Sequence, residues 1–216
     1  MNRLLTIAAA ALSGFLIAGT AARAHPHVWV TMKSNVVYAP DGTLIGIRHA
    51  WTFDDMYSAF AVQGLDQKEK GKFTTEELQP LAKVNVEALK EYDYFSFARV
   101  NGKMAQFVDP VEYRLEYDSK QTVLKLHFLL PFKTPVKAKA LRLEVFDPEY
   151  FVDFALDQND PVALEGAPNG CALNLDKPKG LSQELAQRLA AVPADGKIPP
   201  GSYGEAFANK IMVTCP

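Results

Sequence analysis

HVWVTMKSNVVYAPDGTLIGIRHAWTF, residues 27–53, is the stretch that decides the fold. Residues 27–38 and 43–53 are rich in β-branched and aromatic side chains, which favour strands. Pro40-Asp41-Gly42 lies between them and is typical of a tight turn. The stretch therefore predicts a β-hairpin.

The turn also fixes which residues of the hairpin face each other. With Asp41-Gly42 as a two-residue turn, the facing pairs are Trp29 with Asp54 and Ser34 with His49. At the rise of a strand, His49 then lies roughly 23 Å from His27. The register predicts Asp54, and not His49, as the neighbour of the histidines that precede the first strand.

Residues 1–24 have the features of a cleaved export signal. A basic start at Arg3 is followed by a largely apolar run over 4–18, and Ala22 and Ala24 give the small-x-small pattern of a cleavage site. The run is too short for a membrane anchor. We therefore expect a signal peptide over 1–24 and a periplasmic domain over 25–216, with no membrane insertion of the processed chain.

Cleavage after Ala24 would leave His25-Pro26-His27 at the new N-terminus. Imidazole binds zinc, nickel, cobalt and copper, and an N-terminal α-amine ligates near neutral pH. Pro26 has no amide proton, so the square-planar amino-terminal copper site is excluded, whereas a brace of the α-amine, His25 and a second imidazole is kept as an alternative. The pattern predicts metal binding at His25 and His27.

Three carboxylates are candidate oxygen ligands for the same ion. Asp54 and Asp55 follow the second strand, where one of them alternatively caps the next helix. Asp153 lies between Val152 and Phe154, where it is either a further ligand or the outward residue of an edge strand. A mixed histidine and carboxylate set without thiolate favours zinc, nickel or cobalt.

Residues 54–92 predict an inserted pair of helices with an EF-hand-like loop over 66–77. Asp66, Gly71 and Glu77 occupy positions 1, 6 and 12 of that loop. Lys68 and Lys70 stand at positions 3 and 5, where oxygen ligands are needed, which argues against calcium binding. Thr74 with Glu77 is typical of a capping box at the start of the second helix.

The rest of the chain is rich in strand patterns. Strands are expected over 94–100, 103–108, 111–117, 122–130, 140–146 and 210–215, with a helix over 182–192. Cys171 and Cys215 are the two cysteines of an expected export product and predict one disulfide. The expected fold is a single α+β domain of mostly antiparallel sheets, with the helical insertion and a C-terminal disulfide.

Composition argues against a nucleic acid or an anionic membrane as partner, because both require a basic protein surface. Lysine and arginine number 23 against 25 aspartate and glutamate, so there is no basic field. The sequence has neither the strained serine turn of hydrolases nor a zinc-protease helix motif, so we do not expect an enzyme.

Several segments together resemble a bacterial exported family of unknown function: Ala24-His-Pro-His-Val-Trp29, Trp51-Thr-Phe-Asp-Asp55, Gly64-Leu-Asp66 before GKFTTEEL, Asp147-Pro-Glu-Tyr-Phe-Val-Asp-Phe154, and Cys215. Members are often described as the periplasmic component of an uncharacterised ABC-type transport system and are commonly encoded beside nickel/cobalt-type permeases. Their EF-hand loops are often more acidic, and Lys68 and Lys70 depart from that pattern. The resemblance implies an inner-membrane metal permease or transporter as partner.

The expected function is a periplasmic accessory protein that binds a divalent transition metal and supplies a metal transport system. Two alternatives remain open at this point. One is a binding or assembly module without metal, in which His25 and His27 are a polar start to a strand. The other is an enzyme, with copper in a histidine brace or a metallohydrolase centre.

Overall fold

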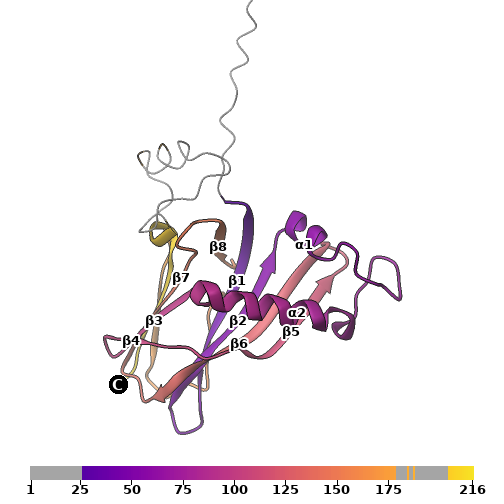
Figure 1. Ribbon diagram of the computed structural model, residues 1–216. Coiled ribbons are helices and arrows are strands. Elements are labelled where there is room, and N and C mark those ends of the chain that lie inside the picture. The colour runs from indigo at the N-terminus through magenta and orange to yellow at the C-terminus, as the bar shows by residue number, and fades with distance from the viewer. Residues whose placement is uncertain (1–25, 179–183, 185–186, 188–203) are drawn as a thin grey trace, which may run out of the picture.

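The predicted hairpin forms the centre of the larger of two sheets. The computed structural model describes residues 26–178, 184, 187 and 204–216 (Figure 1). The hairpin consists of β1 (Val28–Tyr38) and β2 (Leu44–Phe53). Val30 pairs with Phe53 and Ser34 with His49, as the sequence predicted. The Asp54 backbone N–H donates to the Trp29 carbonyl, which extends the same register to the end of β2.

The turn of the hairpin is one residue longer than predicted. Ala39 N–H donates to the Thr43 carbonyl, so Pro40, Asp41 and Gly42 form a three-residue loop, and Gly42 has the positive φ of 80° that such a loop requires. A bulge where Val37 gives way to Tyr38 restores the predicted register along the rest of the hairpin.

Two sheets make up the β structure. In the first the order is β5-β6-β2-β1-β8, with β9 also beside β1. Its added strands are β5 (Val111–Asp118), β6 (Val123–Val136), β8 (Val152–Leu156) and β9 (Leu164–Glu165). The second has the order β10-β11-β7-β3-β4, formed by β10 (Ala172–Asp176), β11 (Asn209–Thr214), β7 (Ala140–Val145), β3 (Ser96–Val100) and β4 (Lys103–Ala105). Pairing is antiparallel except where β8 and β9 run parallel to β1.

The helical segment after β2 contains α1 (Asp55–Ala61), α2 (Thr75–Leu89) and the 3₁₀ segment η1 (Lys90–Phe95); a second 3₁₀ turn, η2 (Gly204–Phe207), precedes β11. The predicted capping box starts α2, with Thr74 and Glu77 bonded to each other's backbone N–H. Pro80 lies within α2.

The loop between α1 and α2 uses its glutamate for backbone contacts. The Glu77 carboxylate accepts hydrogen bonds from the N–H groups of Thr74 (2.8 Å) and Lys68 (3.0 Å). The structure shows the predicted order of helix, loop and helix. The likeness of the loop to an EF-hand stays a prediction.

One hydrophobic core lies between the two sheets and under α2. Figure 1 shows α2 crossing the strands β2, β6 and β5, with β3, β4 and β7 beside it. The inner-facing residues of the first sheet, such as Ile47 and Trp51, share this core with Leu143 of the second sheet and with Leu78 and Val86 of α2. The result is a mostly β fold to which α2 contributes one covering layer.

The predicted disulfide is present between Cys171 and Cys215. It joins the start of β10 to the end of β11, two neighbouring strands. Most of the helix predicted over 182–192 lies outside the described residues. Within the described part of the chain, no helix is both long enough and apolar enough to cross a membrane.

Candidate metal-binding face

The beginning of β1 presents alternate side chains to the outside of the first sheet. Val28 and Val30 point into the core, whereas Trp29 is 47% exposed and His27, two residues earlier, is also exposed. Since side chains alternate along a strand, His27 and Trp29 lie on the same outer face. The His27 ring packs on the Phe151 ring with a centroid distance of 4.7 Å.

The parallel strand β8 brings Asp153 to the same face. Asp153 is paired with Trp29 in the sheet, so these two residues lie side by side. The carboxylate is half-buried and has no hydrogen bond or ion pair within the described residues. Burial raises its pKa above the ordinary value for aspartate. A partly desolvated carboxylate without a counter-charge favours binding of a cation.

Asp54 lies on the other side of Trp29 and holds two elements together. Its Oδ2 accepts a hydrogen bond from Trp29 N–H at 2.9 Å, and its Oδ1 accepts one from Tyr57 N–H at 2.8 Å, the N-cap contact of α1. Of the two aspartates, Asp54 is therefore the cap. Asp55 is the first residue of α1 and is exposed.

Strand spacing decides which candidate residues can share one ion. Neighbouring strands are about 4.8 Å apart, so Asp54 and Asp153, on opposite sides of β1, have backbones roughly 10 Å apart. Both oxygens of Asp54 are also already engaged, by Trp29 N–H and Tyr57 N–H, which makes Asp54 the poorer partner for Asp153 around one ion. His27 directly precedes β1 and Asp153 lies in the neighbouring β8, so only one strand spacing separates their backbones laterally.

The structure brings together only part of the predicted ligand set. His27, Asp54 and Asp153 surround Trp29, while His25 lies outside the described residues. Among the residues that are described, no three of histidine, cysteine, aspartate and glutamate form a group that could hold a metal ion. The described residues alone therefore do not supply a complete set of metal ligands.

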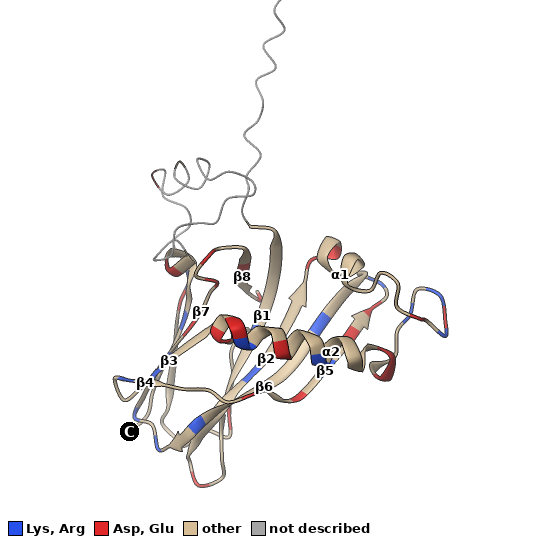
Figure 2. Cartoon of the chain, viewed as in Figure 1, with Lys and Arg blue, Asp and Glu red and all other residues tan. Residues whose placement is uncertain are grey.

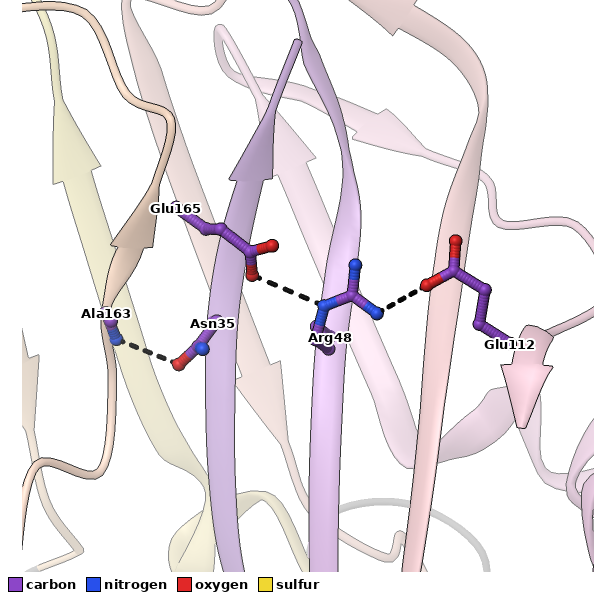
Figure 3. Close-up of polar contacts among 5 residues, drawn as sticks. All are labelled: Asn35, Arg48, Glu112, Ala163 and Glu165. Carbon is purple, nitrogen blue, oxygen red and sulfur yellow. Dashed lines mark hydrogen bonds and ion pairs between the residues drawn. The ribbon is translucent and has the colours of Figure 1, made fainter. Parts of the chain in front are cut away.

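Two other charged groups on this outer face have ion-pair partners. Arg48 of β2 lies between Glu112, at 2.6 Å, and Glu165, at 3.3 Å (Figure 3). Asp157 follows the end of β8, four residues after Asp153, and its carboxylate lies 3.9 Å from Lys33 Nζ. Asp153 has no such ion-pair partner among the described residues, because the residue beside it in β1 is Trp29 and not a lysine or arginine.

The exposed side of α2 carries charges of both signs. Figure 2 shows acidic and basic residues interspersed along α2.

The other two described histidines, His49 and His127, lie away from the start of β1. His49 is fully buried between the sheets, where its Nδ1 lies 2.9 Å from Ser34 Oγ and its Nε2 lies 3.3 Å from Ser96 Oγ. Burial lowers its pKa to about 3. The sequence contained a signal for this burial, because His49 alternates in phase with Ile47, Trp51 and Phe53.

His127 lies on the outer face of β6 and is half-buried. Its Nε2 is 3.1 Å from Glu116 Oε2 but outside hydrogen-bond geometry. Burial lowers its pKa, and the Glu116 carboxylate opposes that shift. It faces Ala50 of β2, which in turn pairs with Lys33 of β1, four residues along the strand from Trp29.

Comparison with known proteins gives a family without an established role. The model of the family "Protein of unknown function (DUF1007)" matches residues 10–215. An uncharacterised 15.5 kDa protein from the trpE 3′ region of Spirochaeta aurantia is 27% identical over 106 residues, which cover 49% of this chain and 74% of that protein. The chain therefore belongs to the DUF1007 family of proteins of unknown function.

Proposed function

We propose that this protein is a periplasmic accessory that binds a divalent transition metal, zinc, nickel or cobalt, and supplies it to a metal transport system in the inner membrane. His25, His27 and Asp153 are the proposed ligands. Asp54 positions the start of β1, and Asp55 is a candidate for an additional oxygen donor.

One observation carries the proposal: Asp153 is a half-buried carboxylate without a partner in the described residues, one strand away from His27 and on the same face. Keeping such a group charged costs stability, and a bound cation offsets that cost. Imidazole and carboxylate together suit zinc, nickel and cobalt.

The proposed periplasmic location has two supports. One is the apolar run over 4–18 with its small-residue cleavage pattern. The other is the disulfide between Cys171 and Cys215, since disulfides persist in oxidising compartments.

The 66–77 loop is proposed to serve as a structural connection without calcium. Its position-12 residue, Glu77, already accepts two backbone N–H groups. Lys68 and Lys70 add positive charge where an EF-hand needs oxygen ligands.

Calorimetric titration with zinc, nickel, cobalt and copper tests the metal proposal, using protein whose N-terminus at His25 is verified by mass spectrometry. We expect binding at micromolar or lower concentration, lost in a His25→Ala/His27→Ala variant. Asp153→Asn should weaken binding roughly tenfold or more, the usual effect of losing a charged ligand. His127→Gln is the matched control, because it removes a histidine from the same outer face outside the site.

Absence of binding by the processed protein would contradict the proposal and favour a binding or assembly module without metal. Equal affinity in the wild type and in the double histidine variant would place any bound metal elsewhere. Catalytic turnover by a copper-loaded form would instead support the histidine-brace enzyme.

A further inference from the structure

A cavity of about 320 Å³ lies on the inner side of the first sheet, away from the face that carries Asp153. Its walls come from the C-terminal half of α2, from η1, from the ends of β1 and β2, and from the segment 147–154. This volume is at the lower end of the range for small-molecule sites.

The lining is dominated by aromatic rings. Trp51, Phe53, Tyr57, Tyr92, Phe95, Phe151 and Phe154 all line the cavity. Trp51 meets Phe154 edge to face with centroids 4.9 Å apart, and Tyr92 stacks on Phe95 at 5.3 Å. Rings that are held by one another form a rigid apolar wall, which suits a flat apolar ligand.

One hydrogen-bond donor in this wall has no partner. Trp51 is 1% exposed, and its Nε1 has no hydrogen-bond acceptor within the described residues. Two other polar side chains of the wall are engaged: the Tyr57 hydroxyl donates to Asn85 Oδ1 at 3.1 Å, and Asn85 Nδ2 donates to the Leu81 carbonyl at 2.9 Å. Buried indole N–H groups normally find an acceptor, so the Trp51 N–H is the group of this lining residue that a ligand acceptor would satisfy.

Charge restricts the ligand further. Among the described residues that line the cavity, none is lysine, arginine or histidine, and two are acidic, Asp147 and Glu149. The Asp147 carboxylate is engaged by the backbone N–H groups of Glu149, Phe151 and Val152, each at 2.9 Å. An anionic ligand would meet carboxylates without a compensating cation, so anions are disfavoured.

The backbone that supplies part of the wall is strained. Asp93, Tyr94 and Phe95 are consecutive non-glycine residues with φ of 50°, 54° and 48°. Left-handed backbone is costly for such residues and clusters at functional sites. Here it carries the Phe95 ring onto the cavity wall and into contact with Trp51, at a centroid distance of 6.5 Å.

We propose that this cavity binds an uncharged, ring-sized apolar molecule that carries one hydrogen-bond acceptor, which the Trp51 indole N–H recognises. The cavity and the proposed metal face adjoin at Phe151, whose ring lines the cavity and also packs on His27, but the proposed cavity ligand is recognised without a metal ion.

A matched series of three probes tests the proposal: acetophenone, which has a ring and a carbonyl acceptor; ethylbenzene, which lacks the acceptor; and benzoate, which is anionic. The chain contains two tryptophans, so its ¹H–¹⁵N spectrum shows two indole N–H signals, and a Trp29→Phe variant identifies the one from Trp51. We expect acetophenone to shift the Trp51 signal saturably. Ethylbenzene should bind roughly three- to tenfold more weakly, the value of one hydrogen bond, and benzoate should not bind.

Ala88→Phe provides a variant that leaves the core intact, because Ala88 is an exposed residue of α2 at the cavity wall. It should abolish the acetophenone shift by filling the entrance. Val84→Phe adds the same bulk on the same helix at a position 62% exposed and outside the wall, and should leave the shift unchanged. No saturable shift with acetophenone at 10 mM, equal affinity for ethylbenzene, or a shift that survives Ala88→Phe would each overturn the proposal.

Discussion

At the scale of single residues, Asp153 carries a cost that the fold does not relieve. Burial raises the pKa of its carboxyl group, so the folded state binds a proton more readily than the unfolded state does. Stability from this group is therefore greatest at low pH and is lost as the pH rises through the ordinary aspartate range. A residue kept at such a cost is a functional candidate.

We expect Asp153→Asn to raise the free energy of unfolding at pH 7, because the variant has no charge to bury. The gain should shrink as the pH falls toward the ordinary pKa of aspartate, where the wild-type carboxyl is itself protonated. Urea unfolding at pH 7 and near pH 4 measures both values. Asp157→Asn is the control: Asp157 has Lys33 at 3.9 Å, so its replacement should bring no comparable gain. A loss of stability at pH 7 in Asp153→Asn would contradict this account.

At the scale of elements, one carboxylate fastens the first helix to the first strand. Asp54 accepts from Tyr57 N–H at the start of α1 and from Trp29 N–H at the start of β1. We expect Asp54→Ala to lower the free energy of unfolding by about 1–3 kcal/mol, since it removes an N-cap and leaves a strand N–H without its acceptor. Asp54→Asn keeps one acceptor oxygen, so its free energy of unfolding should lie between those of the wild type and of Asp54→Ala.

Urea unfolding measures the global change, and amide hydrogen exchange of Trp29 and Tyr57 locates it. Faster exchange at both amides in Asp54→Ala, with exchange at Ile211 in the second sheet little changed beyond the global effect, is the expected pattern. Wild-type protection of both amides in the alanine variant would show that Asp54 does not join these elements.

The elements also show which parts of the site could be predicted from sequence. The hairpin register was predictable because turn residues and strand patterns are local, and it correctly set Trp29 beside Asp54. The pairing of Trp29 with Asp153 was not, because β1 and β8 are far apart in sequence and parallel pairing leaves no turn signal.

The cavity was unpredictable for a related reason. Its wall combines α2, η1 and the segment 147–154, and the left-handed turn at Asp93, Tyr94 and Phe95 contains no glycine to mark it. His49, in contrast, shared the spacing of the apolar residues of β2, so strand alternation alone indicated its burial.

At the scale of the whole molecule, His49 links the two sheets through polar contacts inside the core. Ser34 belongs to β1 and Ser96 to β3, and the ring lies between their hydroxyl groups. A hydroxyl group both donates and accepts, so these contacts can form in either protonation state of the ring. The neutral ring is favoured because burial penalises the charged one.

Acid should therefore destabilise the fold through this residue. Burial lowers the pKa of His49 to about 3, whereas an unfolded histidine has its ordinary pKa of about 6.5. The stability that depends on neutral His49 is present above pH 6.5 and is lost as the pH falls from 6.5 toward 3. Between pH 7 and pH 5 the loss should be about 2 kcal/mol, at a pH where most carboxylates are still ionised.

Urea unfolding of the wild type and of His49→Gln at both pH values measures this contribution. The glutamine variant is less stable at pH 7, because it fills the site imperfectly, but it should lose most of the pH dependence. His127→Gln is the control, since His127 is only half-buried and Glu116 partly offsets the burial that lowers its pKa. The same pH dependence in His49→Gln as in the wild type would mean that other groups govern acid unfolding, and that the contact between the sheets does not depend on a neutral ring.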